Sequence, residues 1–209
     1  MRGLFITLEG GDGAGKSTQI KNIESFFEKK GLVVVHTREP GGTQISEKLR
    51  DILLDSHNTE MEAVTEMLIY AAARAQHVRE IVKPALETGN IVICDRFVDS
   101  SIAYQTYGRN LGDMVRVVNE YATDRLTPDI TFWMDIDPDA GKERVSKMGD
   151  FDRLEMEERD FHYRVYEGYK TIAESESGRV KRIDASRSVE EISEEIKKYL
   201  VEICEKRGI

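Results

Sequence analysis

The sequence has little cysteine and little proline, and each shortage narrows the kind of protein that it can encode. Its 209 residues include two cysteines, Cys94 and Cys204, too few for a disulfide framework or a cysteine-rich metal site. We expect both thiols to be reduced, as in the cytoplasm. Only four prolines interrupt the chain, and repeats, low-complexity stretches and linker-like segments are missing. Residues 1–209 are therefore expected to form a single domain.

Long apolar runs and an excess of positive charge are missing as well. No segment approaches the roughly 18 apolar residues of a membrane span. The apolar stretch after Arg2 is too short for a signal peptide, so none is expected. The net charge is −9, which leaves no broad basic surface to neutralise a nucleic-acid backbone. We expect a cytoplasmic protein that has neither a membrane nor a nucleic acid as partner.

Several catalytic signatures are also absent. The histidines show no ligand spacing such as H-E-x-x-H, so we expect them to be structural or surface residues. The sequence lacks an Asn-Lys-x-Asp run, which would read guanine, and the H-R-D loop of protein kinases. Glu9 and Asp12 are the only obvious candidates for a general base. A phosphate acceptor would not need one, because its oxygens are already ionised near neutral pH.

The strongest positive signal is a glycine-rich run near the start of the chain. Residues 10–17 read GGDGAGKS and directly follow the apolar stretch Leu4–Leu8. This is the phosphate-binding loop G-x-x-x-x-G-K-[ST], in which backbone N–H groups and the next helix's N-terminus face the anion. Lys16 would reach the terminal phosphates and Ser17 would hold Mg²⁺. Because a strand precedes the run and an amphipathic helix follows it, a chance match is disfavoured, and we expect a nucleoside triphosphate site.

Short apolar runs alternate with longer helical patterns along the chain. Continuous apolarity indicates strands buried on both faces, hence a parallel sheet covered by helices. The apolar pattern of the first helix ends at Phe27, and the helix is expected to stop at residues 29–31. The last helix is expected to begin with a capping box at Ser188. We predict an α/β fold: a three-layer P-loop NTPase with a five-stranded parallel sheet, flanking helices and a mobile lid. The expected strands are Leu4–Leu8, Leu32–Thr37, Ile91–Cys94, Ile130–Met134 and Val180–Ile183.

A long central helix is predicted from about Glu60 to Leu86. Tyr70, Arg74 and His77 share one stripe of it, where an aromatic ring and a guanidinium could bind a base and a phosphate. Periodicity alone slightly favours the alternative, a Tyr–Arg contact on the solvent side. The core-facing stripe is expected to consist of Met61, Val64, Leu68, Ala71, Ala75, Val78 and Val82.

Two further groups of charged residues point to phosphate chemistry. The strand Ile91–Cys94 ends in Asp95 and Arg96, at the sheet edge where ligands of α/β proteins gather. We expect Asp95 to hold water on the Mg²⁺ and Arg96 to bind phosphate oxygens, in preference to a solvent-facing strand-end pair. The basic residues between 139 and 155, among them Arg144, predict a mobile lid over the phosphates. An ordinary solvated face fits their composition equally well.

Five motifs together resemble one family. They lie at Leu8–Gln19, Arg38–Thr43, Tyr70–Arg74, Asp95–Gln105 and Ile183–Glu190. In these residues the chain resembles the thymidylate kinases of the bacterial type, members of the P-loop nucleoside monophosphate kinases. The resemblance spans residues 4–200 and implies transfer of the γ-phosphoryl group of ATP to dTMP with Mg²⁺, for dTTP synthesis, by a homodimer. It leaves a kinase for another nucleotide and an ATP-dependent switch as the rival functions.

The resemblance also implies roles for individual residues. Tyr70 would stack on thymine and Arg74 would bind the dTMP phosphate, which reverses the balance left by periodicity. Asp12 would meet the 3′-hydroxyl, Arg96 would lie between the two phosphates, and Tyr104 would favour deoxyribose. Further dTMP contacts are assigned to Arg38, Ser100, Ser101 and Gln105, and ATP contacts to Gly10, Gly11, Asp12, Gly13, Ala14, Gly15, Lys16, Ser17, Thr18, Arg144, Ala185 and Ser186.

One position departs from part of the family. Thymidylate kinases place a catalytic arginine either in the phosphate loop or in the lid, and here the loop position is Gly13. The resemblance therefore implies a lid cation, for which Lys147 and Arg153 are the two candidates. Ser146 and Met148 stand where arginines are common in the family, so this lid is less basic than expected.

Overall fold

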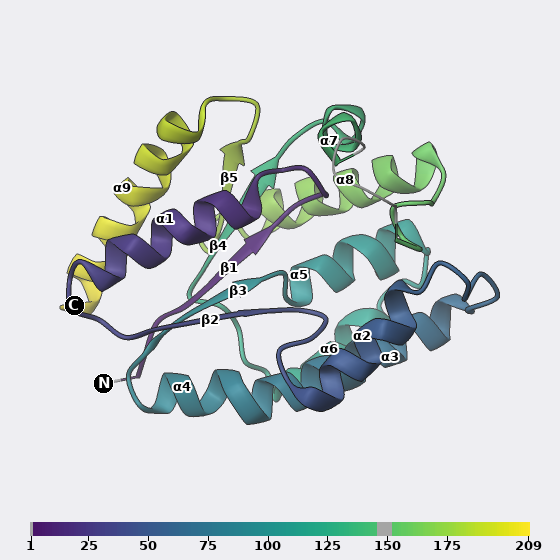
Figure 1. Ribbon diagram of the computed structural model, residues 1–209, viewed down its shortest axis with the longest axis horizontal. Coiled ribbons are helices and arrows are strands. Elements are labelled where there is room, and N and C mark those ends of the chain that lie inside the picture. Colours follow the sequence, from purple (N-terminus) through teal and green to yellow (C-terminus); the bar gives the residue numbers. More distant parts are fainter. Residues whose placement is uncertain (1, 146–151) are drawn as a thin grey trace.

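The computed structural model describes residues 2–145 and 152–209, with side chains except at Val145. Its centre is one sheet of five parallel strands in the order β2-β3-β1-β4-β5 (Figure 1). All five expected strands are confirmed, with β2 beginning two residues later than expected, at Val34. The strands are β1 (Phe5–Glu9), β2 (Val34–Arg38), β3 (Ile91–Asp95), β4 (Ile130–Asp135) and β5 (Val180–Asp184).

Helices cover both faces of the sheet and complete the three layers (Figure 1). Leu4, just before β1, and Ile6 and Leu8 within it pack toward α1 (Lys16–Glu28) and α9 (Val189–Arg207), because side chains alternate between the two faces of a strand. Phe5 points the other way, toward η1 and α4. The helices are α1 (Lys16–Glu28), α2 (Gln44–Leu54), α3 (Ala63–His77), α4 (Lys83–Glu87), α5 (Val98–Ser101), α6 (Met114–Thr123), α7 (Pro138–Val145), α8 (Arg159–Ser175) and α9 (Val189–Arg207), with π-helical turns η1 (Val78–Val82) and η2 (Ile102–Gly108).

The predicted helix ends agree with the structure at both ends of the chain. Helix α1 ends at Glu28, and Gly31 follows with a φ of +76°, which a glycine adopts without strain. Helix α9 begins after a full capping box, in which Ser188 and Glu191 each cap the other's backbone N–H. In the parts of the chain that the structure describes, no helix is long and apolar enough to cross a membrane.

The expected central helix is wrong in two respects. It begins at Ala63 rather than Glu60, and the π-helical turn η1 interrupts it before α4. The expected core stripe is correct only in part: Ala71, Val78 and Val82 are buried, whereas Val64 and Leu68 are 44% and 50% exposed. The buried residues of α3 include polar ones, among them Arg74 and His77, beside apolar ones such as Met67. The stripe was drawn from apolar residues alone, whereas this helix buries charged groups that have partners.

The topology fixes where a ligand can bind. All five strands are parallel, so their carboxyl ends lie at one edge of the sheet, where the phosphate loop leaves β1. Each strand ends there in a charged residue, namely Glu9, Arg38, Asp95, Asp135 and Asp184.

Candidate active site

The phosphate loop has the backbone that its glycines predict. Gly13 and Gly15 have φ angles of +75° and +83°, and α1 starts immediately afterwards at Lys16. The Lys16 Nζ donates to the carbonyl oxygens of Gly10 and Gly11, at 3.1 and 3.0 Å. Burial lowers the pKa of Lys16 from its usual value. The loop therefore presents a buried amine and a helix N-terminus to an anion.

Helix α7 lies against this loop, backbone to backbone. A Cβ added to Gly13 would lie 2.3 Å from the carbonyl oxygen of Gly141, so no arginine fits at the loop position without moving α7. Farther along α7, Arg144 donates to the carbonyl oxygens of Gly13 and Ala185, at 3.3 and 3.2 Å. Three of the residues assigned to ATP, from three distant parts of the chain, thus lie together.

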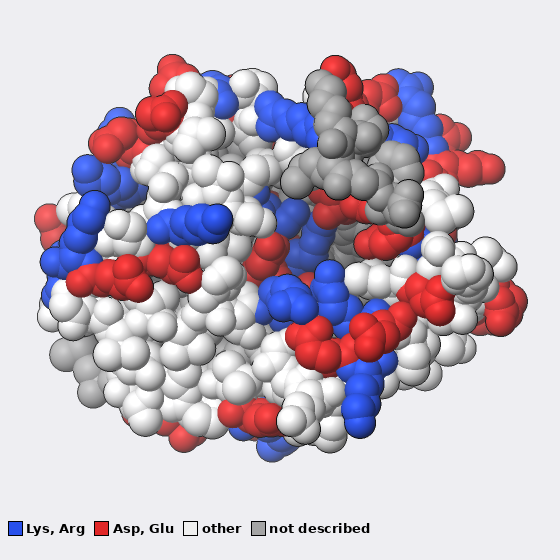
Figure 2. All heavy atoms as spheres, in the orientation of Figure 1, with Lys and Arg blue, Asp and Glu red and all other residues white. Residues whose placement is uncertain are grey.

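A hollow of about 540 Å³ opens over the phosphate loop. Figure 2 shows lysine and arginine side chains around a hollow in the middle of the face it displays. Arg50 was missed by the sequence analysis, since nothing distinguishes it from other polar residues of α2. Its guanidinium donates to the carbonyl oxygen of Pro40 at 2.9 Å. The cations that line the hollow are Lys16, Arg38, Arg50, Arg96 and Arg144.

A second, narrower cavity of about 90 Å³ lies on the α3 side. Four residues line both cavities, so two ligands bound there would face one another across them: Asp12, Glu39, Arg50 and Arg96. Of the residues assigned to dTMP, only Arg38 lines the larger hollow and not this one. The lining of the second cavity includes Asp12, Tyr70, Arg74, Arg96, Ser100, Ser101, Tyr104 and Gln105.

Arg96 occupies the junction of the two cavities. Its Nη2 lies 2.6 Å from Asp12 Oδ1, and its guanidinium carbon is 5.4 Å from the centre of the Tyr104 ring. Burial would raise the pKa of Asp12, but Arg96 and Lys16 lower it below its usual value. Asp12 and Arg96 therefore form a charged pair beside the phosphate loop.

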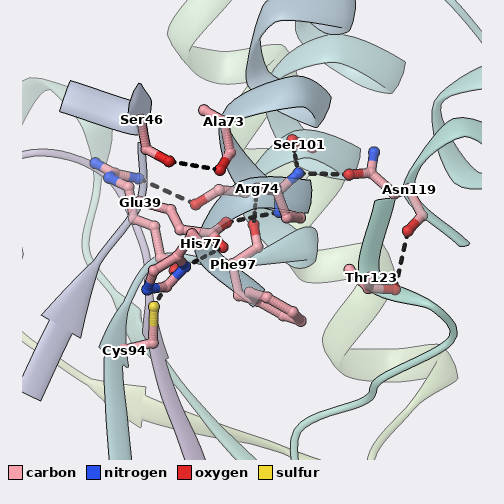
Figure 3. Close-up of polar contacts among 12 residues, drawn as sticks. Glu39, Ser46, Ala73, Arg74, His77, Cys94, Phe97, Ser101, Asn119 and Thr123 are labelled. Carbon is pink, nitrogen blue, oxygen red and sulfur yellow. Dashed lines mark hydrogen bonds and ion pairs between the residues drawn. The ribbon is translucent and has the colours of Figure 1, made fainter. Parts of the chain in front are cut away.

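Arg74 lines the second cavity and is 2% exposed, and Figure 3 shows its polar contacts. Its guanidinium donates to Glu39 at 2.6 Å, to Ser101 at 2.8 Å, to Asn119, and to the carbonyl oxygen of Phe97 at 2.9 Å. Four of its five N–H groups are thus donated within the protein. Arg74 is therefore buried, whereas periodicity alone had favoured a position on the solvent side.

A buried histidine, His77, contacts the same Glu39 carboxylate that accepts from Arg74. The ring nitrogens of His77 lie 2.8 Å from Glu39 Oε1 and 2.7 Å from Thr37 Oγ1. Cys94 lies near enough to complete a possible set of metal ligands with Glu39 and His77. Both ring nitrogens are occupied by hydrogen bonds, so His77 links Thr37 to the Glu39 carboxylate.

The two candidates for the lid cation differ in what can be said of them. Arg153 is 8% exposed and donates to Glu66 Oε2 at 2.7 Å and to the carbonyl oxygen of Leu53 at 2.8 Å. It lines neither of the two cavities. Lys147 lies outside the described residues. The structure therefore does not bring Arg153 to the phosphate loop.

The oxygen atoms near the loop fit a magnesium ion. Asp95 Oδ1 is buried and, among the described residues, has no hydrogen-bond partner. The Ser17 side chain is exposed at the first turn of α1, and both side chains line the same hollow. Carboxylate and hydroxyl oxygens suit a hard divalent cation that keeps several of its waters. Ser17 and Asp95 are thus the residues that would hold Mg²⁺.

Comparison with known proteins agrees with the sequence motifs. A sequence model of the family described as thymidylate kinase matches residues 8–196. The thymidylate kinase of Exiguobacterium sp. is 45% identical over 210 residues, covering 100% of this chain and 99% of the relative. That of a Geobacillus species is 50% identical over 195 residues, covering 92% and 93%.

A solved structure shows the same fold. The crystal structure of the thymidylate kinase from Ehrlichia chaffeensis is 33% identical and covers 96% of this chain and 99% of its own, with a TM-score of 0.77. The phosphate loop and the flanking cavity agree with these similarities. The chain therefore belongs to the thymidylate kinase family of ATP-dependent phosphotransferases.

Proposed function

We propose that this protein transfers the γ-phosphoryl group of ATP to dTMP, giving dTDP and ADP. The observation that carries this proposal is the junction of the two cavities at Asp12 and Arg96. A triphosphate on the loop and a monophosphate in the second cavity would meet at this junction, as in-line transfer requires. The relatives named thymidylate kinase supply the identity of the nucleotides.

For ATP, the loop residues 10–18 would hold the phosphates, with Lys16 on the terminal ones. Arg144 and the turn at Ala185-Ser186 would flank the adenine, which their contact across the loop supports. Mg²⁺, held by Ser17 directly and by Asp95 through water, would neutralise charge on the transferred group.

For dTMP, the second cavity supplies complementary chemistry. Tyr70 would stack on thymine, and Ser100, Ser101 and Gln105 would contact the edge of the pyrimidine. Asp12 would accept from the 3′-hydroxyl and Tyr104 would crowd the 2′ position. The phosphate would then lie among Arg38, Arg74 and Arg96. Because four of the N–H groups of Arg74 are committed within the protein, Arg96 would carry most of the phosphate charge.

The protein's catalytic task would be positioning and neutralisation of charge. The oxygens of dTMP are ionised near neutral pH, so no general base is needed. Lys16, Arg96 and a lid cation would share the charge on the transferred phosphoryl group. We propose Lys147 as that cation, since Arg153 is bound to Glu66. Lid closure would exclude water and so limit hydrolysis of ATP.

A panel of phosphate acceptors, assayed for ADP release, tests this proposal. We expect dTMP to give far more turnover than dUMP, other nucleoside monophosphates or deoxynucleosides, because the pocket suits a methylated pyrimidine and a 2′-deoxy sugar. Higher turnover with another acceptor would contradict the choice of dTMP. ATP turnover that no acceptor stimulates would instead favour a nucleotide-dependent switch.

We also propose that the protein is a cytoplasmic homodimer. Exposed apolar side chains of α3 and α6, two helices that pack together, support the dimer. The two cysteines are unpaired and buried, which suits the reducing cytoplasm. Sedimentation velocity should give twice the chain mass of 23.8 kDa, and a monomer at micromolar concentration would contradict the proposal. The exposed apolar side chains of α3 and α6 that would form the dimer interface are Val64, Leu68, Met114, Val117 and Tyr121.

A further inference from the structure

Glu9, the last residue of β1, is a fully buried carboxylate next to the phosphate loop. Its Oε1 accepts from the backbone N–H of Phe97 at 2.7 Å. Its Oε2 accepts from the Ser100 hydroxyl at 2.5 Å and from the Tyr169 hydroxyl at 3.2 Å. One carboxylate beside the phosphate loop thus ties together the segment after β3 and helix α8.

The first of these bonds acts on the backbone of Arg96. Arg96 has a φ of +66°, in the left-handed region that residues other than glycine rarely adopt. Its own N–H donates to the carbonyl oxygen of Leu8 at 2.9 Å, and the next N–H, that of Phe97, donates to Glu9. Both peptide groups that flank Arg96 are therefore bound to β1. Glu9 supplies the second of these two attachments.

The other two bonds act on the Arg96 side chain. Its Nη1 lies 3.4 Å from Ser100 Oγ and 3.3 Å from Tyr169 Oη, and the two hydroxyls are 2.8 Å apart. A hydroxyl has one proton to donate, so an oxygen that donates toward Glu9 keeps its lone pairs for the guanidinium. An ionised Glu9 can only accept hydrogen bonds, so the protons of the Ser100 and Tyr169 hydroxyls point toward it. The Tyr169 proton does so either directly or through Ser100. A protonated or amidated side chain can donate, and the orientation is then lost.

We propose that Glu9 is a positioning residue for phosphoryl transfer: its ionised carboxylate holds the left-handed backbone of Arg96 and orients the Ser100 and Tyr169 hydroxyls that carry the guanidinium. Glu9 touches neither cavity and so acts through Arg96. This inference rests on the proposed function, in which Arg96 lies between the two phosphates.

The surroundings of Glu9 make its charge sensitive to pH near neutrality. Burial and the negative charge of Asp99 raise the pKa of Glu9 to about 7, although the bonds from Ser100 and Phe97 and the charge of Arg96 oppose this. Glu9 also interacts electrostatically with Lys16, Cys94 and Tyr169. Glu9 therefore passes from protonated to ionised as the pH rises through about 7.

Stability and activity should respond to this ionisation with opposite signs. Between the usual glutamate pKa of 4.5 and about 7, the folded protein holds the Glu9 proton more tightly than the unfolded chain does. The contribution of Glu9 to the free energy of unfolding thus falls as the pH rises through this window. The turnover number kcat should rise as the pH passes through about 7, because the ionised form orients Arg96.

The variant Glu9→Gln tests the proposal. Its amide keeps the shape of the side chain but adds a donor, so Arg96 loses part of its support. We expect kcat to fall about 10- to 100-fold, as small misplacements of catalytic groups do. The KM values for ATP and dTMP should stay within about threefold, because binding is retained. Part of the wild-type rise of kcat near pH 7 should come from Glu9 and not from ionisation of dTMP. This part should disappear in Glu9→Gln and remain in the exposed control Glu205→Gln.

Several outcomes would overturn the proposal. A Glu9→Gln variant with wild-type kcat would do so, and so would a raised KM with kcat unchanged or a retained step near pH 7. If this variant does not fold, the wild-type protein still decides the question. Its kcat, corrected for ionisation of the acceptor phosphate, must then rise between about pH 6 and 8, one unit either side of the Glu9 pKa of about 7, while its unfolding free energy falls from about pH 5.5 to 7. All measurements use the acceptor with the highest turnover in the panel, so that a wrong choice of dTMP and a wrong role for Glu9 stay distinguishable.

Discussion

Replacement of Arg96 by alanine should lower kcat by about 100- to 1,000-fold, the size of effect seen when one preorganised donor to transition-state charge is lost. Arg96 lies at the junction of the two cavities, where charge on the transferred group would build up. Its removal also leaves Asp12 without its partner at 2.6 Å, which places an uncompensated negative charge beside the phosphates. Steady-state assays of ADP release with dTMP give the kcat.

ATP binding should survive this change, because the loop amides and Lys16 remain. Titration with a fluorescent ATP analogue should give a dissociation constant within about threefold of wild type, which separates lost transition-state stabilisation from lost binding. Arg116→Ala removes an exposed arginine of α6 and serves as the matched control. Turnover of the Arg96→Ala variant within a few-fold of wild type would refute the role given to Arg96.

The strands and the phosphate loop were predictable from sequence because their signals are local. A run such as Ile91–Cys94 is apolar throughout only if both faces of a parallel strand are covered. The glycines at 13 and 15 mark a backbone that other residues avoid. The positions of Asp95 and Arg96 at the end of that strand then followed from topology alone.

Helix α3 was harder to predict because its buried face mixes polar and apolar side chains. A count of apolar residues assigns Val64 and Leu68 to the core, yet the structure buries Glu66 and Arg74 and exposes both apolar residues. Arg74 is buried because Glu39, a residue 35 positions away, accepts its hydrogen bond. Such pairings form only in the folded chain, so no periodicity in the sequence announces them. Asn119 was missed for the same reason.

Replacement of Arg153 by methionine should lower the free energy of unfolding by about 3 kcal/mol, the lower end of what loss of one partner in a buried ion pair costs. Glu66 is fully buried and accepts from Arg153, Arg109 and Gln105. Burial would raise the pKa of Glu66, but these bonds lower it below the usual value. Without Arg153, part of that support is gone and the carboxylate stays buried. Urea unfolding at pH 7 measures the loss.

The same variant decides whether Arg153 or Lys147 serves the phosphates. If Arg153 is structural, the folded Arg153→Met protein at low temperature should keep most of its kcat, while Lys147→Ala should lose kcat with its unfolding transition unmoved. Arg159→Met controls for the substitution itself, since Arg159 pairs with Asp139 at the surface and should change neither quantity. The opposite result, a stable Arg153→Met protein with kcat reduced as in Arg96→Ala, would mean that Arg153 leaves Glu66 when the nucleotides bind. Glu66 would then be the resting partner of a catalytic arginine, and its network with Arg109 would hold the lid until the substrates arrive.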